Sequence, residues 1–321
     1  MVVHNTRIEL LQLNDDASFA GAIGRLIADP FLTATGKKLL GSLCNRKRHE
    51  TVQFYATANF DTIAQVEISP KWIALNLCTY PNTGMRYRQA VDALVEHLGG
   101  PASLFRQEER TVVLPGLLLG DGLESTWKEL AARYDFDCQQ MDCVAYDFEE
   151  GPEVEMEEER QQHAMILNMN GLYLDSLKES DAPLVDKCWP FGKNGKGAFV
   201  RNLVENFPST CARRRDTHEP VAWCLQYWYG SLGNLYVTTP WRRKGLGSVL
   251  AKAQAENIVR STGNDKLARH WVHAWVVAKN VGGQQMFDGL ASFKQRHDRI
   301  CYFRMESKRR KSQDTVIGAG L

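Results

Sequence analysis

The stretch from residue 235 to residue 248 reads Leu-Tyr-Val-Thr-Thr-Pro-Trp-Arg-Arg-Lys-Gly-Leu-Gly-Ser. Its first part is rich in β-branched and aromatic residues, which favours a strand. A basic turn with two glycines follows, and apolar residues then recur at helical spacing at Leu246, Val249, Leu250 and Ala253. The stretch therefore predicts a strand, a short basic turn and an amphipathic helix, an order that is typical of α/β folds.

The turn has the features of an anion-binding site. The first turn of a helix leaves backbone N–H groups without acceptors, and the helix dipole adds partial positive charge there. Gly245 and Gly247 lack Cβ atoms where a ligand would approach the backbone, and Arg242, Arg243 and Lys244 add cationic donors. The same composition occurs in a plain helix cap, so composition alone leaves both interpretations open.

The spacing of the glycines and basic residues helps to decide between an anion-binding loop and a plain helix cap. It fits neither the phosphate loop of nucleoside triphosphatases nor the dinucleotide pattern GxGxxG. Arg242-x-x-Gly245-x-Gly247, after a strand that ends in Val-x-x-Pro, resembles the acyl-CoA pyrophosphate loop of the GNAT acyltransferase superfamily. Downstream, the predicted strand Trp271–Val277 leads to Asn280, which resembles the superfamily's next strand and helix start.

A narrower resemblance lies upstream. In chain order, Leu174–Trp189, Phe191–Asn194, Phe207–Cys211 and Pro220–Trp223 are similar to motifs of the glycine N-acyltransferase family, and the match extends to about Phe303. Those enzymes pair a degenerate N-terminal GNAT-like half with a C-terminal half that holds acyl-CoA. The resemblance therefore implies an α/β fold of two tandem GNAT-like mixed-sheet domains.

The order of elements supports a duplication independently. The first half predicts helices at 19–27, 90–98 and 123–131, and strands at 52–58, 63–68, 72–79, 111–114 and 141–148. The second half predicts helices at 183–189, 199–207, 246–253 and 286–290, and strands at 210–214, 221–226, 234–238, 271–277 and 300–305. Leu75–Thr79 lies about 160 positions before the similar Leu235–Thr239, which indicates two copies of one unit.

An acidic run around a Gly-Pro pair, Glu149–Glu159, predicts the boundary between the copies. We expect a degenerate N-terminal domain at 1–150, an acidic linker at 151–165, an acyl-CoA-binding domain at 166–307 and a basic flexible tail at 308–321. The alternative for the acidic run is a charged helix start. The tail includes Lys308–Lys311, which is expected to be a solvated charge run.

Composition sets limits on the class of protein. The 321 residues include 39 basic and 38 acidic side chains, a net charge of +1, so no overall field favours nucleic acid or an anionic membrane. The longest apolar runs are only of strand length, which disfavours an integral membrane protein. The eight cysteines form no CxxC pair or zinc spacing, so we expect no metal and a reducing compartment. The cytoplasm is expected, with the mitochondrion as alternative.

The resemblance also implies where the cosubstrate acyl-CoA binds: between strands 234–238 and 271–277. The implied contact residues are Tyr236, Val237, Thr238, Arg242, Arg243, Lys244, Gly245, Leu246, Gly247, Ser248 and Asn280. The equivalent stretch of the first half, Tyr80–Arg88, has one glycine, so we expect no CoA there and a supporting role for that half.

The catalytic base is an open question in the sequence. Relatives that conjugate glycine usually carry an acidic residue three positions before the Asn, and Val277 stands there in this chain. His273 and His270 are titratable candidates because an imidazole near neutrality suits deprotonation of an amine. Of these, His273 is the predicted catalytic residue, with a water chain as the alternative.

The sequence also leaves the identity of the acyl acceptor undecided. The resemblance implies transfer to the amine of glycine, and another small amine or amino acid is equally compatible. Trp223 and Tyr227–Tyr229 are expected in the core or around an apolar acyl pocket, and Arg213–Arg215 in an exposed turn. A catalytically silent acyl-CoA-binding or interaction protein of the same fold is the alternative function. A nucleic-acid binder is disfavoured by the balanced charge.

Overall fold

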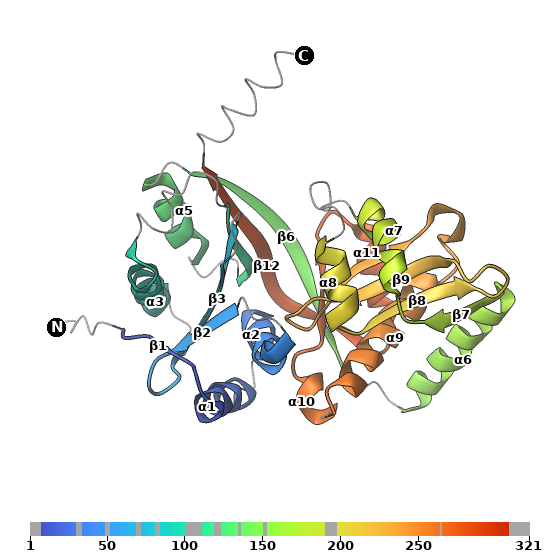
Figure 1. The fold of residues 1–321 in the computed structure, drawn as a ribbon, viewed down its shortest axis with the longest axis horizontal. Helices are drawn as coiled ribbons and strands as arrows, with labels where there is room; N and C mark the ends of the chain where they lie inside the picture. The colour runs from blue at the N-terminus through green and yellow to red at the C-terminus, as the bar shows by residue number, and fades with distance from the viewer. Residues whose placement is uncertain are drawn as a thin grey trace, which may run out of the picture. The chain divides into compact units, whose positions relative to one another are not determined.

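A computed structural model describes residues 8–29, 34–48, 52–68, 72–80, 84–100, 111–118, 123–133, 136–149, 153–189, 198–263 and 265–307. The chain divides into two compact units (Figure 1). Unit 1 comprises Met1–Cys143 and Asp298–Leu321, and unit 2 comprises Val144–His297. The chain therefore passes from one unit to the other within two strands, β6 (Phe136–Phe148) and β12 (Phe293–Ser307).

Unit 1 is a mixed sheet with helices. Its elements are β1 (Leu11–Gln12), α1 (Asp16–Ile27), α2 (Ala34–Cys44), a 3-10 turn at Arg46–Arg48, β2 (Val52–Ala56), β3 (Thr62–Ile68), β4 (Trp72–Thr79), α3 (Gly84–His97), β5 (Thr111–Leu118), α5 (Leu123–Arg133) and the first part of β6. The strand order is β1-β2-β3-β4-β5-β12-β6. The β4 and β5 strands run parallel, and their paired residues are Trp72 with Thr111, Ile73 with Val112 and Ala74 with Val113.

Unit 2 has the order β12-β6-β11-β10-β9-β8-β7. Its elements after β6 are α6 (Glu153–Met169), β7 (Leu172–Asp175), a 3-10 turn (Glu179–Asp181), α7 (Ala182–Cys188), α8 (Ala198–Asn206), β8 (Ser209–Arg214), β9 (Pro220–Gln226), β10 (Ser231–Val237), a 3-10 turn (Thr239–Trp241), α9 (Leu246–Ser261), α10 (Asp265–Arg269), β11 (His273–Val277), α11 (Val281–Asp288) and β12. Strands β7 to β10 pair antiparallel, whereas β10 and β11 run parallel.

Helices cover both faces of the unit 2 sheet (Figure 1). On one face, α7 and α8 pack on a core that includes Trp223 and Leu225 of β9. On the other face lies α9, whose Gln254 accepts a hydrogen bond from the Thr210 hydroxyl of β8 at 2.7 Å. Alternate residues of each strand therefore face different helices, as the period of a strand requires.

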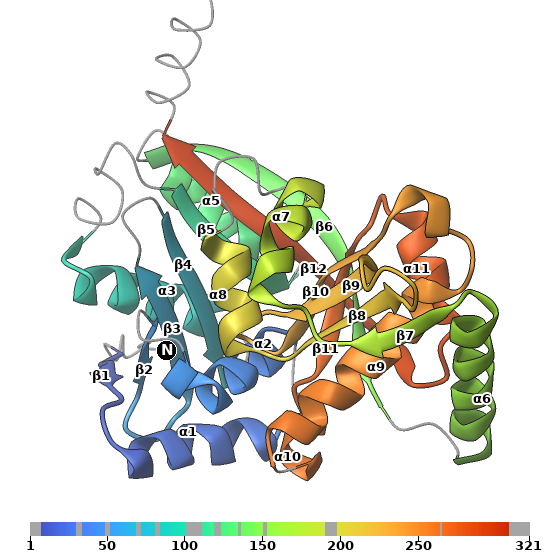
Figure 2. The same cartoon turned by 45° about the vertical axis from the view of Figure 1, so that its right-hand side comes forward.

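The two units repeat one order of elements, as the sequence predicts. In each, antiparallel strands lead to a strand, a helix and a parallel strand: β4, α3 and β5 in unit 1, and β10, α9 and β11 in unit 2. Figure 2 shows α9 beside the strands of unit 2 in a second view. The sequence missed α2, whose pattern of small and basic residues has few large apolar side chains.

The predicted linker at 151–165 is wrong. Residues 153–169 form helix α6, which packs against β7 and α9 inside unit 2. The acidic run is not wholly solvated, because Glu159 is only 9% exposed and forms an ion pair with Lys252 of α9, itself 2% exposed. The Lys252 ammonium also donates to the Met156 carbonyl at 3.2 Å. Helix α6 is thus part of the core, and the alternative of a charged helix start was the correct one.

The predicted domain limits also differ from the structure. The first compact unit ends at Cys143 instead of 150, and the second ends at His297 instead of 307. The reason is strand pairing: Ile300–Met305 of β12 pair antiparallel with Val112–Leu118 of β5, in unit 1. The predicted tail at 308–321 lies outside the described residues.

The predicted exposed turn at Arg213–Arg215 is correct only in part. Arg213 is 2% exposed on β8 and binds two carboxylates, Asp175 through Nε at 2.8 Å and Asp181 at 2.6 Å. These hydrogen bonds hold the pKa of Arg213 above its ordinary value although burial alone would lower it. Arg214 and Arg215 do lie at the hairpin, where Arg214 pairs with Asp216.

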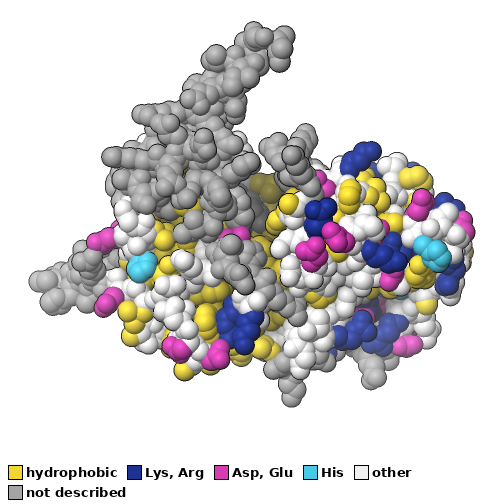
Figure 3. All heavy atoms as spheres, in the orientation of Figure 1, with side chains coloured by type: hydrophobic (Ala, Val, Ile, Leu, Met, Phe, Trp, Pro, Cys, Tyr) yellow, Lys and Arg dark blue, Asp and Glu magenta, His cyan; other side chains and the backbone are white. Residues whose placement is uncertain are grey.

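On the face of the molecule shown in Figure 3, the described basic and acidic side chains are interspersed.

A truncation tests whether β12 completes unit 1. A chain that ends at His297 loses the strand that covers β5, including the buried Ile300, Cys301 and Met305, and should leave unit 1 unfolded. A chain that ends at Ser307 keeps the strand and is the matched control. Hydrogen exchange of β3 and β4 is the measurement, and equal protection in the two truncated chains would contradict the assignment of β12 to unit 1.

The buried ion pair between Lys252 and Glu159 predicts strong non-additivity. Lys252→Met or Glu159→Gln alone leaves a buried charge without its partner and should cost about 3–5 kcal/mol of unfolding free energy. The double variant Lys252→Met/Glu159→Gln should cost clearly less than the two single losses together. Denaturant unfolding followed on α9 measures this, and simple additivity would mean that the pair contributes little to the core.

Candidate functional site

The candidate site lies where the parallel strands β10 and β11 part. Their pairing is limited to Ser231 with His273 and Leu232 with Ala274. Beyond these pairs β10 continues to Val237 and β11 to Val277. Beyond these pairs, the backbone N–H and C=O groups on the facing edges of the two strands are not hydrogen-bonded to each other. The sheet therefore opens between β10 and β11 toward their carboxyl ends.

A bulge in β10 accompanies the parting. The register of β10 against β9 shifts between Gly233 and Tyr236, and Asn234 in this interval has φ 48°. Asn tolerates the left-handed region better than most residues, and an extra residue in a strand bends it locally. Gly233 is required here, because a Cβ would come within 2.1 Å of the Tyr227 ring.

Strand β10 leads directly into the predicted loop. Arg243 and Gly245 have φ values of 60° and 78°, and Gly245 is the N-cap of α9 with no side-chain cap. Alternating left-handed residues turn successive N–H groups to one side, which forms an anion-binding concavity. In the described part of the chain, the backbone N–H groups of residues 243–248 have no hydrogen-bond acceptor. The loop thus presents unsatisfied donors at the positive end of a 16-residue helix.

The basic side chains of the loop lie at the surface. Arg242 donates through Nε to the Val237 carbonyl at 2.9 Å, and its guanidinium lies 5.4 Å from the Tyr236 ring centroid. The Lys244 ammonium lies 4.6 Å from the centroid of the Trp241 ring. Arg243 is exposed. These three cations are therefore available to an anion at the helix start.

Two glycines of this loop are required by the packing of α6 and α11 around it. A Cβ on Gly247 would come within 2.7 Å of Met286 Sδ on α11, so α11 lies next to the start of α9. A Cβ on Gly245 would meet Ile166 Cδ1 of α6 at 2.7 Å, in addition to the strain of a positive φ. The helix start is therefore enclosed by α6 and α11, and both glycines fit the space that is left.

Asn280 is the N-cap of α11. Its Oδ1 accepts from the Gly283 N–H at 3.0 Å, whereas no hydrogen bond in the described chain involves its Nδ2. The residue therefore has a structural role and also offers a donor at an exposed position next to α9. Asn280 begins α11, and Met286 of the same helix lies beside Gly247, so this helix and the loop are neighbours.

The other predicted contact residues have mixed environments. Tyr236 is half-buried and stacked on Trp223, with ring centroids 5.2 Å apart. The Thr238 hydroxyl donates to the Val221 carbonyl at 2.8 Å and so ties the end of β10 to β9. Leu246 is 1% exposed, so its backbone and not its side chain faces a ligand. Ser248 lies half-buried in the first turn of α9.

His273 is a buried residue of the sheet. It is 1% exposed and is the first residue of β11, where it pairs with Ser231. Its side chain lies on the face of the sheet that α7 and α8 cover. Its Nδ1 lies 2.7 Å from the Trp271 carbonyl, which can only accept, so the proton of this hydrogen bond is on Nδ1. The imidazole is therefore next to the parting of the strands but is enclosed by aromatic rings. His270 is exposed and lies before β11.

The aromatic residues that the sequence singled out belong to the core on this face. Trp223, Trp228 and Tyr229 are each at most 6% exposed, and Tyr227 is half-buried against the same cluster. The buried core alternative is therefore correct for the first three. The sequence did not single out Trp275 of β11, whose ring lies 5.9 Å from that of Tyr229.

Two buried cysteines of the unit 2 sheet are poor nucleophiles. Burial raises the pKa of Cys211 on β8 to about 12 and raises that of Cys224 on β9 further. The Cys224 Sγ lies 3.7 Å from the Gly233 carbonyl, at the bulge. All eight cysteines are free thiols. A thiolate at either of these two positions is therefore strongly disfavoured near neutral pH.

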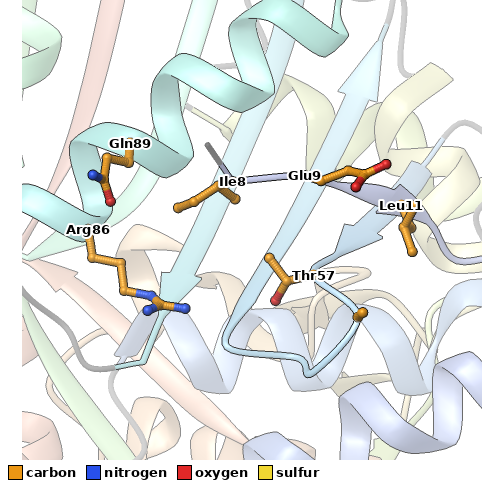
Figure 4. Close-up of a pocket in the computed structure, with 7 residues that line it drawn as sticks. Ile8, Glu9, Leu11, Thr57, Arg86 and Gln89 are labelled. Atoms are coloured by element: carbon orange, nitrogen blue, oxygen red, sulfur yellow. The ribbon is translucent and has the colours of Figure 1, made fainter. Parts of the chain in front are cut away.

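A separate cavity of about 260 Å³ lies in unit 1 (Figure 4). It is lined by Ile8, Glu9, Leu11, Thr57, Ala58, Arg86 and Gln89. Arg86 of α3 already pairs with Asp61 at 3.2 Å. The cavity shares no residue with the candidate site, and of the equivalent loop in unit 1, residues 81–83 lie outside the described residues.

Among the residues that the structure describes, no group of three or more His, Cys, Asp or Glu side chains is arranged to hold a metal ion. No helix in the described ranges is long and apolar enough to cross a membrane.

Comparisons with known proteins bear on the family to which this chain is similar. Residues 211–300 match the FR47-like protein family, which is GNAT-related. A segment of 82 residues is 34% identical to a mouse "Glycine N-acyltransferase-like protein"; it covers 25% of this chain and only 27% of that relative. The predicted resemblance to GNAT acyltransferases is thereby confirmed.

Solved structures confirm the fold. A Drosophila protein matches with a TM-score of 0.66 at 17% identity, over 92% of this chain and 98% of the other. A tandem GNAT protein from the clavulanic acid biosynthesis pathway matches with a TM-score of 0.50 at 13% identity, with the same coverage. The predicted α/β fold of two tandem GNAT-like domains is therefore correct.

Proposed function

We propose that this chain is an acyl-CoA-dependent N-acyltransferase that moves an acyl group from CoA to the amine of glycine or another small amine or amino acid. The observation that carries the proposal is the loop at residues 242–248, where unsatisfied N–H groups meet three cations at the opening between β10 and β11. The partial match to a mouse glycine N-acyltransferase-like protein supports the same reaction class.

The residues present fit the pyrophosphate of a CoA thioester. The N–H groups of residues 243–248 would donate to its oxygens, and Arg242, Arg243 and Lys244 would neutralise its charge. Gly245 and Gly247 add no side chain to the loop, as expected where phosphates approach the backbone, and a Cβ at either position would meet Ile166 or Met286. Asn280 Nδ2 is a further donor on the neighbouring helix. The pantetheine chain would follow the unpaired edges of β10 and β11.

The chemical step is a direct acyl transfer. The amine nitrogen attacks the thioester carbonyl, loses a proton, and the carbon–sulfur bond breaks to give an amide and the CoA thiol. Holding both reactants at the parted strands supplies much of the rate, and unpaired backbone N–H groups of β10 would polarise the carbonyl. The raised pKa values of Cys211 and Cys224 argue against a covalent acyl-cysteine at these positions.

His273 is the proposed group that removes the amine proton, directly or through water. Its Nδ1 is engaged with the Trp271 carbonyl, so Nε2 is the ring nitrogen that would accept the amine proton. The alternative function is a catalytically silent acyl-CoA-binding protein, and Val277 at the end of β11 keeps this alternative in view because a hydrocarbon cannot accept a proton. The free cysteines fit a reducing compartment such as the cytoplasm.

Ligand-dependent stability tests the binding part of the proposal. CoA or acetyl-CoA at 100 times its dissociation constant should stabilise the protein by about 2.7 kcal/mol, seen as a rise in Tm. Gly247→Asp should abolish the rise, because the carboxylate repels phosphate and its Cβ meets Met286. Gly263→Asp, at a positive-φ glycine with open space around it, is the control for general strain. No rise in the wild type would refute the proposal.

Release of the CoA thiol separates an enzyme from a silent binder. With acetyl-CoA or benzoyl-CoA and a panel of small amines and amino acids, we expect thiol release that depends on one acceptor class. His273→Ala should lower kcat at least 100-fold and remove the pH dependence near neutrality, since general base catalysis typically contributes about 10²–10⁴-fold. An unchanged rate and pH profile would exclude the histidine, and absence of thiol release with every acceptor would favour the binder.

A further inference from the structure

Two aromatic side chains flank the opening between the strands on the same face of the sheet. Ser231 pairs with His273, so the residues two and four positions further along β11, Trp275 and Val277, share the face of His273. Past the bulge, Tyr236 of β10 pairs with Trp223, which belongs to the core on that face. One large ring thus stands on each strand, just beyond the last pair that joins them.

Packing holds the Trp275 indole in place. Its centroid lies 5.1 Å from that of His273 and 5.9 Å from that of Tyr229, whose ring is nearly parallel to it with an interplanar angle of 28°. The side chain is half-buried, whereas His273 and Tyr229 are almost fully buried. The Trp275 indole therefore packs on the buried rings of His273 and Tyr229, and its other side is accessible.

The Tyr236 ring, on β10 across the opening from Trp275, is also held in place by packing. The Tyr236 ring stacks on Trp223 with an interplanar angle of 23°, and the Arg242 guanidinium lies over it. Trp223 is fully buried, so the Tyr236 ring cannot move into the core without displacing it. A chain that enters between β10 and β11 from the phosphate loop reaches these two rings before it reaches the core.

We propose that Trp275 sets the upper limit on the length of the acyl chain that this site accepts. The inference rests on the proposed function, because it places the thioester at the opening between β10 and β11. Short acyl groups end before the indole, whereas longer chains need the space that the indole occupies. Trp275 is thus a specificity-determining residue, and Tyr236 is the lateral wall of the same acyl site.

The test is the affinity of acetyl-, butyryl-, hexanoyl- and octanoyl-CoA for the full chain, measured by calorimetry without an acceptor amine. In the wild type, hexanoyl- and octanoyl-CoA should bind no more tightly than butyryl-CoA. In Trp275→Ala, affinity should keep rising by about fourfold for each added methylene, since each methylene enters apolar space that the indole had filled. Trp275→Phe should give an intermediate limit.

Two controls separate this effect from loss of structure. Free CoA should bind the variants and the wild type equally, which shows that the phosphate loop is intact. Phe199→Ala removes an exposed ring of α8 that lies against Trp189 and Tyr227, and should leave the chain-length profile unchanged. A profile shared by the wild type and Trp275→Ala, with CoA bound by both, overturns the inference alone. Failure of the wild type to bind any CoA species overturns the proposed function as well.

Discussion

The site depends on the early end of one strand pairing. Parallel strands normally continue their ladder as far as both strands run, but β10 and β11 are joined only at two residue pairs. The bulge at Asn234 turns the rest of β10 away, at the cost of a left-handed backbone in a residue other than glycine. Such strain in the centre of a sheet persists only when the surroundings hold it, and here it exposes backbone donors at the carboxyl end of two parallel strands.

The surroundings that hold this geometry are charged and buried. Arg213 ties β8 to Asp175 and Asp181, and Lys252 ties α9 to Glu159 of α6. Both cations are 2% exposed, and each is surrounded by oxygen acceptors. A buried ion pair fixes one arrangement of its elements, because any other arrangement leaves a charge without a partner. These ion pairs therefore fix the positions of the outer strands and helices of unit 2, which surround the loop at residues 242–248.

Sequence patterns predicted the local parts of this site well and the long-range parts poorly. Residues 235–248 form a strand, turn and helix because each residue type favours its own place, and nearby Gly and Pro residues mark the limits. Glu159 looked like one of many solvated acids, since its partner Lys252 is far away in the sequence. The bulge had a local signal in Gly233-Asn234 within a strand, which could have been used. The transfer of β12 to unit 1 had none, because strand partners are chosen by tertiary packing.

The central claim is that the N–H groups of residues 243–248 bind the pyrophosphate of an acyl-CoA. Hydrogen exchange of these amides with and without saturating acetyl-CoA measures this directly, because each amide that donates to a bound phosphate exchanges more slowly. If these amides bind the pyrophosphate, protection will be concentrated at residues 243–248. Unchanged exchange there, together with new protection at the start of α3 in unit 1, would contradict it.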